Sequence, residues 1–230
     1  MTEEDFQTRL ERLREDIVAQ GDRVLQQATR AVDAYFDHDP DLAKEAVAIE
    51  SEVDRVDVEI ERRSIPLLAM GQTDEYAIRS VLTIVKVNNE YERIGDDANG
   101  IAETTLDPRR QGSNLPDTFR VMANSVLGML RDANRALAKR DAELARKVLA
   151  FDDTVNRFNR EIMRHTQDRV ARGELALDGA FRVLGVTKSM ERIADHCTNI
   201  CEQVIYLETG KIVRHDPEGW TEPRSPDADG

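Results

Sequence analysis

Residues 92–103 read ERIGDDANGIAE, and residues 191–202 read ERIADHCTNICE. Six of these twelve positions are identical when the second segment is shifted by 99 residues. About one identity is expected by chance, so the pair indicates an internal repeat. The preceding segments also align, at a shift of 102 residues, where Asp39 matches Asp141 and Val53 matches Val155. The chain is therefore expected to contain the same structural unit twice, over residues 1–106 and 107–213.

Apolar residues recur every three or four positions through nearly all of both units, which is typical of amphipathic helices. The first unit is expected to contain helices over about 6–35, 40–70 and 74–105. The second is expected to contain one helix ending near 139, one between Asp141 and Arg172, and one over about 177–209. Asp39 and Asp141 are predicted N-caps, and Gly71 and Gly210 are predicted ends of helices.

Short connections make successive helices antiparallel. The predicted fold is therefore all-α, with two tandem antiparallel three-helix bundles related by internal pseudo-symmetry. The last segment, 214–230, holds three prolines among acidic residues and glycines, and is expected to be a disordered acidic tail.

The composition excludes several classes of function. The formal net charge is −13 and no long basic run is present, so nucleic acid is not an expected partner. No apolar stretch approaches the roughly 20 residues of a membrane span. The acidic N-terminus does not resemble a signal peptide, so a cytoplasmic protein is expected.

Cys197 and Cys201 lie four residues apart on one predicted helix and are interpreted as small buried residues, not as a disulfide.

Acidic residues flank the predicted buried stripe on the second and third helices of each unit. Glu92 and Asp96 are four residues apart, as are Glu191 and Asp195, which places each pair on one face of its helix. If these faces meet, several carboxylates converge, and oxygen-rich sites of this kind suit hard or borderline divalent cations. The candidate metal ligands are Glu50, Asp54, Asp57, Glu92 and Asp96 in the first unit, and Asp152, Glu191 and Asp195 in the second.

Other interpretations of these residues stay open. An acid pair on a helix is often only solvated surface, and here Arg93 and Arg192 are alternative partners for the carboxylates. His196 is a further candidate ligand next to Asp195, although the first unit has Asp97 at the matching position. Asn156 and Asn159 replace two of the acids in the second unit, so its site carries less charge.

The duplicated motif, together with the aligned helices before it, closely resembles the PhoU family of phosphate-uptake regulators over about residues 10–212. This resemblance implies a non-enzymatic regulator of phosphate transport and of the phosphate-starvation response. It implies partners, namely the ATPase subunit of a phosphate ABC transporter and a sensor histidine kinase, which would bring the protein to the membrane periphery. It also implies an iron, zinc or other divalent metal cluster at the Glu92/Asp96 and Glu191/Asp195 pairs. A homodimer is an additional possibility.

Three alternatives compete with this interpretation. A di-metal oxidase or ferritin-like enzyme would also use a helical bundle, but its Glu-x-x-His pairs do not occur in this sequence. A purely structural bundle explains the apolar stripes but not the duplicated acidic motif. An accessory protein of a different phosphate carrier would share the fold, and neighbouring genes would distinguish it.

Overall fold

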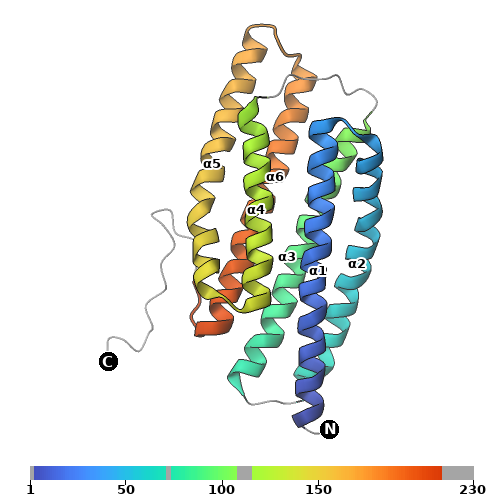
Figure 1. The fold of residues 1–230 in the computed structure, drawn as a ribbon, viewed down its shortest axis with the longest axis vertical. Helices are drawn as coiled ribbons and strands as arrows, with labels where there is room; N and C mark the ends of the chain where they lie inside the picture. Colours follow the sequence, from blue (N-terminus) through green and yellow to red (C-terminus); the bar gives the residue numbers. More distant parts are fainter. Residues whose placement is uncertain (1–2, 71–73, 108–115, 214–230) are drawn as a thin grey trace, which may run out of the picture.

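The computed structural model describes residues 3–70, 74–107 and 116–213, and in these ranges it contains six helices and no strand. The first unit consists of α1 (Glu3–Asp37), α2 (Pro40–Ala69) and α3 (Glu75–Leu106). The second consists of α4 (Asp117–Lys139), α5 (Ala142–Ala171) and α6 (Leu177–Thr209). Figure 1 shows two elongated bundles lying side by side with their helices roughly parallel to the long axis. The all-α fold with a repeated three-helix unit is thus confirmed.

The matching turns of the two units are built in the same way. The Asp39 carboxylate accepts hydrogen bonds from the backbone N–H groups of Asp41 and Leu42, at 2.8 and 3.2 Å. The Asp141 carboxylate accepts one from the Leu144 N–H at 2.9 Å. Each cap of this type stabilises a helix by about 1 kcal/mol. Gly210 ends α6 at φ +71°, as predicted, whereas the predicted cap Gly71 and the tail 214–230 lie outside the described residues.

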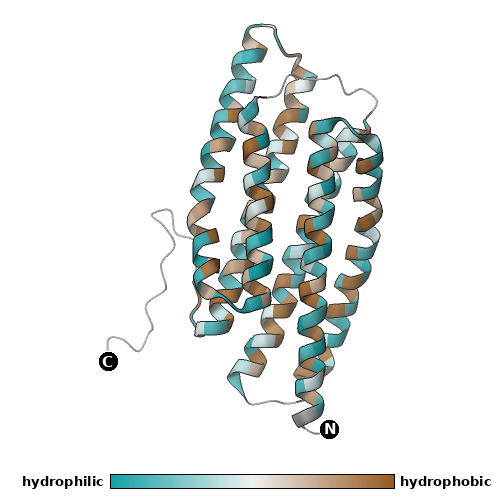
Figure 2. Cartoon of the chain, viewed as in Figure 1, coloured by the Kyte–Doolittle hydropathy of each residue, from teal (hydrophilic) through white to brown (hydrophobic). Residues whose placement is uncertain are grey.

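Each helix buries one face against the other two helices of its unit, and the units join through two further contacts. These contacts pair α3 with α6 and α1 with α4. In the described part of the chain, α2 and α5 contact only helices of their own unit. Figure 2 shows hydrophobic and hydrophilic residues alternating along every helix, as amphipathic packing requires. None of these helices is long and apolar enough to cross a membrane.

A single hydrophobic core runs through both units. At its centre Tyr91 of α3 is fully buried, and its hydroxyl donates to the Asn134 side chain of α4 at 2.9 Å. The Asn134 amide in turn donates to the backbone carbonyl of Gly21 in α1 at 2.6 Å. A Cβ atom at Gly21 would lie only 2.5 Å from the Tyr91 hydroxyl oxygen, so glycine is required for this close approach. Three helices from two units are thereby fixed to one another.

Candidate functional site

The five predicted carboxylates of the first unit form one surface of α2 and α3, hereafter the first acidic face: Glu50, Asp54, Asp57, Glu92 and Asp96. Burial raises the pKa of Glu50 to about 7, with further contributions from the Asp54 and Asp96 charges. Burial also raises the pKa of Glu92, followed by the effects of Asp96 and Asp57. The carboxylates are therefore close enough to repel one another, as the sequence predicted from the two helix faces.

Gly95 on α3 lets α1 and α2 pack closely against α3 at the first acidic face. Its missing Cβ atom would lie 3.2 Å from the Val53 side chain and 3.3 Å from side-chain oxygens of both Gln27 and Glu50. Gln27 is fully buried and donates its amide to the Glu50 carboxylate and to the Gly95 carbonyl, the latter at 3.2 Å. A buried amide therefore holds one end of the first acidic face in place.

Asp57 points to the other end of the face, where it is held by an amide. The Asn88 side chain donates to the Asp57 carboxylate at 2.6 Å and to the Asp57 backbone carbonyl at 3.0 Å. Within the described ranges, no three His, Cys, Asp or Glu side chains are placed so that they could together hold one metal ion. The charge and oxygen chemistry of the face suit a divalent cation, but the side-chain placement does not close around one.

The three predicted carboxylates of the second unit form the second acidic face: Asp152 of α5 with Glu191 and Asp195 of α6. Asp152 is buried and accepts a hydrogen bond from the Asn156 side chain at 2.8 Å. Glu191 instead pairs with Lys188 at 2.8 Å. Burial raises the pKa of Asp195, and the charges of Asp152 and Glu191 add to this effect. The second face thus has the same position as the first but fewer charges.

Between the two units lies a polar group that the sequence did not reveal, hereafter the α3–α6 cluster: Glu90, Asp97, Arg192, His196 and Asn199. His196 Nδ1 lies 2.7 Å from the Glu90 carboxylate, and the Asn199 amide donates to the same oxygen at 3.0 Å. Arg192 pairs with Asp97 at 3.3 Å. His196 and Arg192, which were alternatives for the acidic faces, therefore contact the opposite unit.

Asp97 and His196 occupy the same position of the repeated motif and lie next to each other across the α3–α6 contact, with His196 Nε2 3.9 Å from the Asp97 carboxylate. Burial raises the pKa of Asp97 to about 6, although Arg192 and His196 act in the opposite direction. Burial also opposes ionisation of Glu90, but the hydrogen bonds from His196 and Asn199 lower its pKa overall. Asp97 against His196 is one of six unequal positions in the twelve-residue repeat, so this mismatch was only a weak sequence signal for the contact.

Cys197 and Cys201 are both buried, as predicted. Burial raises the pKa of each thiol, so neither is a reactive nucleophile at neutral pH. Both thiols belong to the hydrophobic core, and Cys197 is close enough to Asp152 and Asp195 of the second acidic face, and to Glu90 of the cluster, to feel their charges.

The fold and the paired acidic faces define a class of protein: two repeated three-helix units, each with carboxylates on the outer flank of its second and third helices. A family model described as "PhoU domain" matches this chain twice, at residues 17–105 and 119–204. The chain therefore belongs to the PhoU family.

Curated relatives and solved structures agree with this assignment. The chain is 28% identical over 211 residues to "Phosphate-specific transport system accessory protein PhoU homolog 1" of Thermotoga maritima, covering 91% of each chain. It is 30% identical over 214 residues to the Pseudomonas aeruginosa homolog, covering 92% of this chain and 88% of the relative. The crystal structure of PhoU from Pseudomonas aeruginosa superposes with a TM-score of 0.84 at 30% identity, over 89% of this chain and 99% of that one. The regulatory protein PhoU from Streptococcus pneumoniae gives 0.82 at 25% identity, over 91% and 99%.

Proposed function

We propose that this protein is a non-enzymatic regulator of phosphate transport and of phosphate-starvation signalling. The observation that carries the proposal is the match over both units, covering 91% and 92% of the chain, to relatives named as accessory proteins of phosphate-specific transport systems. Deletion of its gene is expected to raise phosphate uptake and starvation-gene expression in phosphate-rich medium, and the intact gene should restore both. Unchanged uptake and expression in the deletion strain would contradict this role.

The regulator is proposed to act by contact with the ATPase subunit of a phosphate ABC transporter and with a sensor histidine kinase, at the cytoplasmic face of the membrane. The fold supports this because two outer helices, α2 and α5, are free of contacts between the units in the described residues. Co-purification of tagged full-length protein with the transporter and the kinase, from cells grown in high and low phosphate, tests it. Recovery of a different phosphate carrier instead would favour the alternative accessory role.

The two acidic faces are further proposed to bind divalent cations, with iron and zinc as the first metals to test. Five carboxylates on the first face and three on the second support this, because ligand charge controls affinity for a dication. Binding would require the carboxylates to reorient, since the present placement does not gather three ligands around one point.

Metal analysis of protein purified without chelator gives a direct test. The double variant Glu92→Ala/Asp96→Ala is expected to lose most of the bound metal, and Glu191→Ala/Asp195→Ala less. Asp33→Ala/Asp37→Ala removes an acid pair of the same spacing from α1 and serves as the control. Equal losses from both faces, or a greater loss from the second, would show that carboxylate number does not set the affinity.

A further inference from the structure

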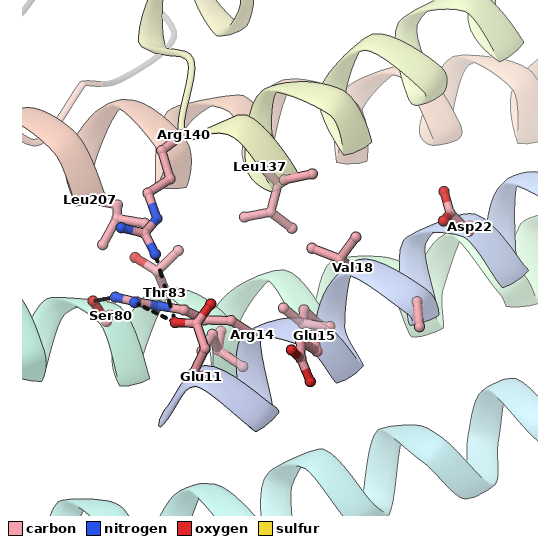
Figure 3. A pocket seen from close by; sticks show the side chains of 14 residues that line it. Glu11, Arg14, Glu15, Val18, Asp22, Ser80, Thr83, Leu137, Arg140 and Leu207 are labelled. Atoms are coloured by element: carbon pink, nitrogen blue, oxygen red, sulfur yellow. Dashed lines mark hydrogen bonds and ion pairs between the residues drawn. The ribbon is translucent and has the colours of Figure 1, made fainter. Parts of the chain in front are cut away.

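A pocket of about 380 Å³ opens at the junction of the two units, away from both acidic faces. It is lined by one side of α1, the N-terminal part of α3, the C-terminal end of α4, and Leu207 of α6. Figure 3 shows that the Arg14 and Arg140 side chains both extend toward the Glu11 carboxylate at one end of this pocket. The pocket therefore combines residues from both repeated units, with two cationic groups on one side.

The two arginines share a single carboxylate oxygen. Arg14 contacts Oε2 of Glu11 at 3.1 Å, and Arg140 lies 4.0 Å from the same atom. Arg14 also donates to the Ser80 hydroxyl at 2.8 Å, and Arg140 donates to the Tyr76 hydroxyl at 3.1 Å. Both guanidinium groups are thus oriented by α3, so the position of the Glu11 oxygen is a site prepared for an oxyanion.

Glu11 is a weak occupant of this position. Its side chain is 59% exposed, whereas that of Arg14 is only 18% exposed. Exposed ion pairs contribute at most about 1 kcal/mol, so an external oxyanion that contacts both arginines can displace the Glu11 carboxylate.

A second polar group in the pocket lacks a partner. Thr83 is 1% exposed and lines the pocket, and its hydroxyl has no hydrogen-bond partner among the described residues. Buried hydroxyls nearly always have a partner, because leaving one unpaired costs about 1–3 kcal/mol. A ligand oxygen near Arg14 would provide one.

The rest of the pocket is apolar and then acidic. As Figure 3 shows, Leu207 lies beside Arg140, Val18 and Leu137 lie between the arginines and Asp22, and Asp22 lies at the far end. Glu15 also lines the pocket, on α1 next to Arg14. Asp22 follows Glu11 by eleven residues on α1, or about 16 Å along the helix axis. A ligand with an anionic group at each end would be repelled there, which favours one oxyanion attached to a small apolar body.

We infer that this pocket binds a small organic phosphate ester, with its phosphate on Arg14 and Arg140 and its apolar portion between α1, α4 and α6. A tetrahedral oxyanion suits two guanidinium forks and the unpaired Thr83 hydroxyl better than a planar carboxylate does. The Ser80 hydroxyl only orients Arg14, because it already donates to the Tyr76 backbone carbonyl at 2.8 Å. Because the ligand would contact both units, its binding would stabilise their relative position. The inference does not depend on the proposed role in phosphate transport.

Calorimetric titration of the full-length chain with phenyl phosphate and, separately, with inorganic phosphate tests the inference. Phenyl phosphate is expected to bind at one site at least about tenfold more tightly than inorganic phosphate, because its ring removes apolar surface from water. No saturable binding of phenyl phosphate would overturn the inference. Equal binding of the two compounds would overturn the assignment of an organic ligand.

Four variants make the test specific. Glu11→Gln removes the competing carboxylate and is expected to tighten binding about threefold or more. Glu143→Gln removes an ion pair of the same spacing on α5 and should leave binding unchanged. Arg140→Gln should weaken binding about tenfold, and Thr83→Val several-fold. Weaker binding by Glu11→Gln, or unchanged binding by both Arg140→Gln and Thr83→Val in folded protein, would show that these residues are only structural.

Discussion

Glu50 provides a quantitative test of the first acidic face. Its pKa is raised from 4.5 to about 7 in the folded protein, mainly by burial and then by the nearby acidic groups. Between these pH values the folded state holds a proton that the unfolded state has lost. The stability associated with Glu50 is therefore greatest at low pH and is lost as the pH rises from about 4.5 through 7.

The size of this effect follows from the shift. A difference of 2.5 pKa units corresponds to at most about 3.4 kcal/mol at 1.36 kcal/mol per unit. Glu50 is only half-buried, so solvent screening reduces the expected value to about 1–2 kcal/mol. The change Glu50→Gln keeps an oxygen acceptor for Gln27 and removes the charge. At pH 8 the free energy of unfolding of this variant is expected to be about 1–2 kcal/mol higher than that of the original protein.

The assay is urea unfolding followed by circular dichroism, in chelator, at pH 5.5, 6.5 and 8. Lower pH is avoided because the sequence pI is about 4.9, where a protein loses solubility. The stabilisation by Glu50→Gln should grow steadily over this range. Glu103→Gln changes an exposed glutamate of α3 and should show no such trend. A destabilised Glu50→Gln variant at pH 8, or a pH-independent effect, would refute the reasoning.

Two further changes test the packing between the units. Gly21→Ala is expected to lower the free energy of unfolding by about 1–3 kcal/mol, because the new Cβ would overlap the Tyr91 hydroxyl. Gly128→Ala is the control: its Cβ would lie in open space on α4, so it should raise the free energy of unfolding by about 0.5–1 kcal/mol. Thermal unfolding of both variants is the check, and equal stabilisation would rule out the close approach. His196→Ala should cost about 2 kcal/mol by leaving Glu90 without its main partner. A double-mutant cycle with Glu90→Gln should give about 1 kcal/mol of coupling, and strict additivity would argue against the contact.

The helices and the two acidic faces were predictable from the sequence because they depend on local spacing. Asp39, Asp141 and Gly210 mark helix ends through short-range hydrogen bonding and backbone conformation. Carboxylates at i and i+4 share a helix face whatever the rest of the chain does.

The directions of those side chains and the contacts between the units were not predictable in the same way. Asp57 turns toward Asn88, 31 residues away, and that choice depends on how α2 and α3 pack. Glu90 and His196 are 106 residues apart, and their pairing requires knowledge that α3 and α6 meet. Such long-range pairings leave no periodic signal, and the mismatch of Asp97 with His196 did not identify them, because it is one of six mismatches in the twelve-residue repeat.

The single core across α3 and α6 affects how this molecule would behave if it were cut in two. Each half, expressed alone, would expose the apolar surface that the other half covers, and His196 and Glu90 would lose their hydrogen bond to each other. Each half is therefore expected to aggregate alone. The two halves should reassemble when mixed, because the α3–α6 and α1–α4 contacts are non-covalent and do not need the connector between α3 and α4. In thermodynamic terms the chain is a tethered heterodimer of duplicated subunits. The tether acts by raising the effective concentration of each three-helix unit in the neighbourhood of the other.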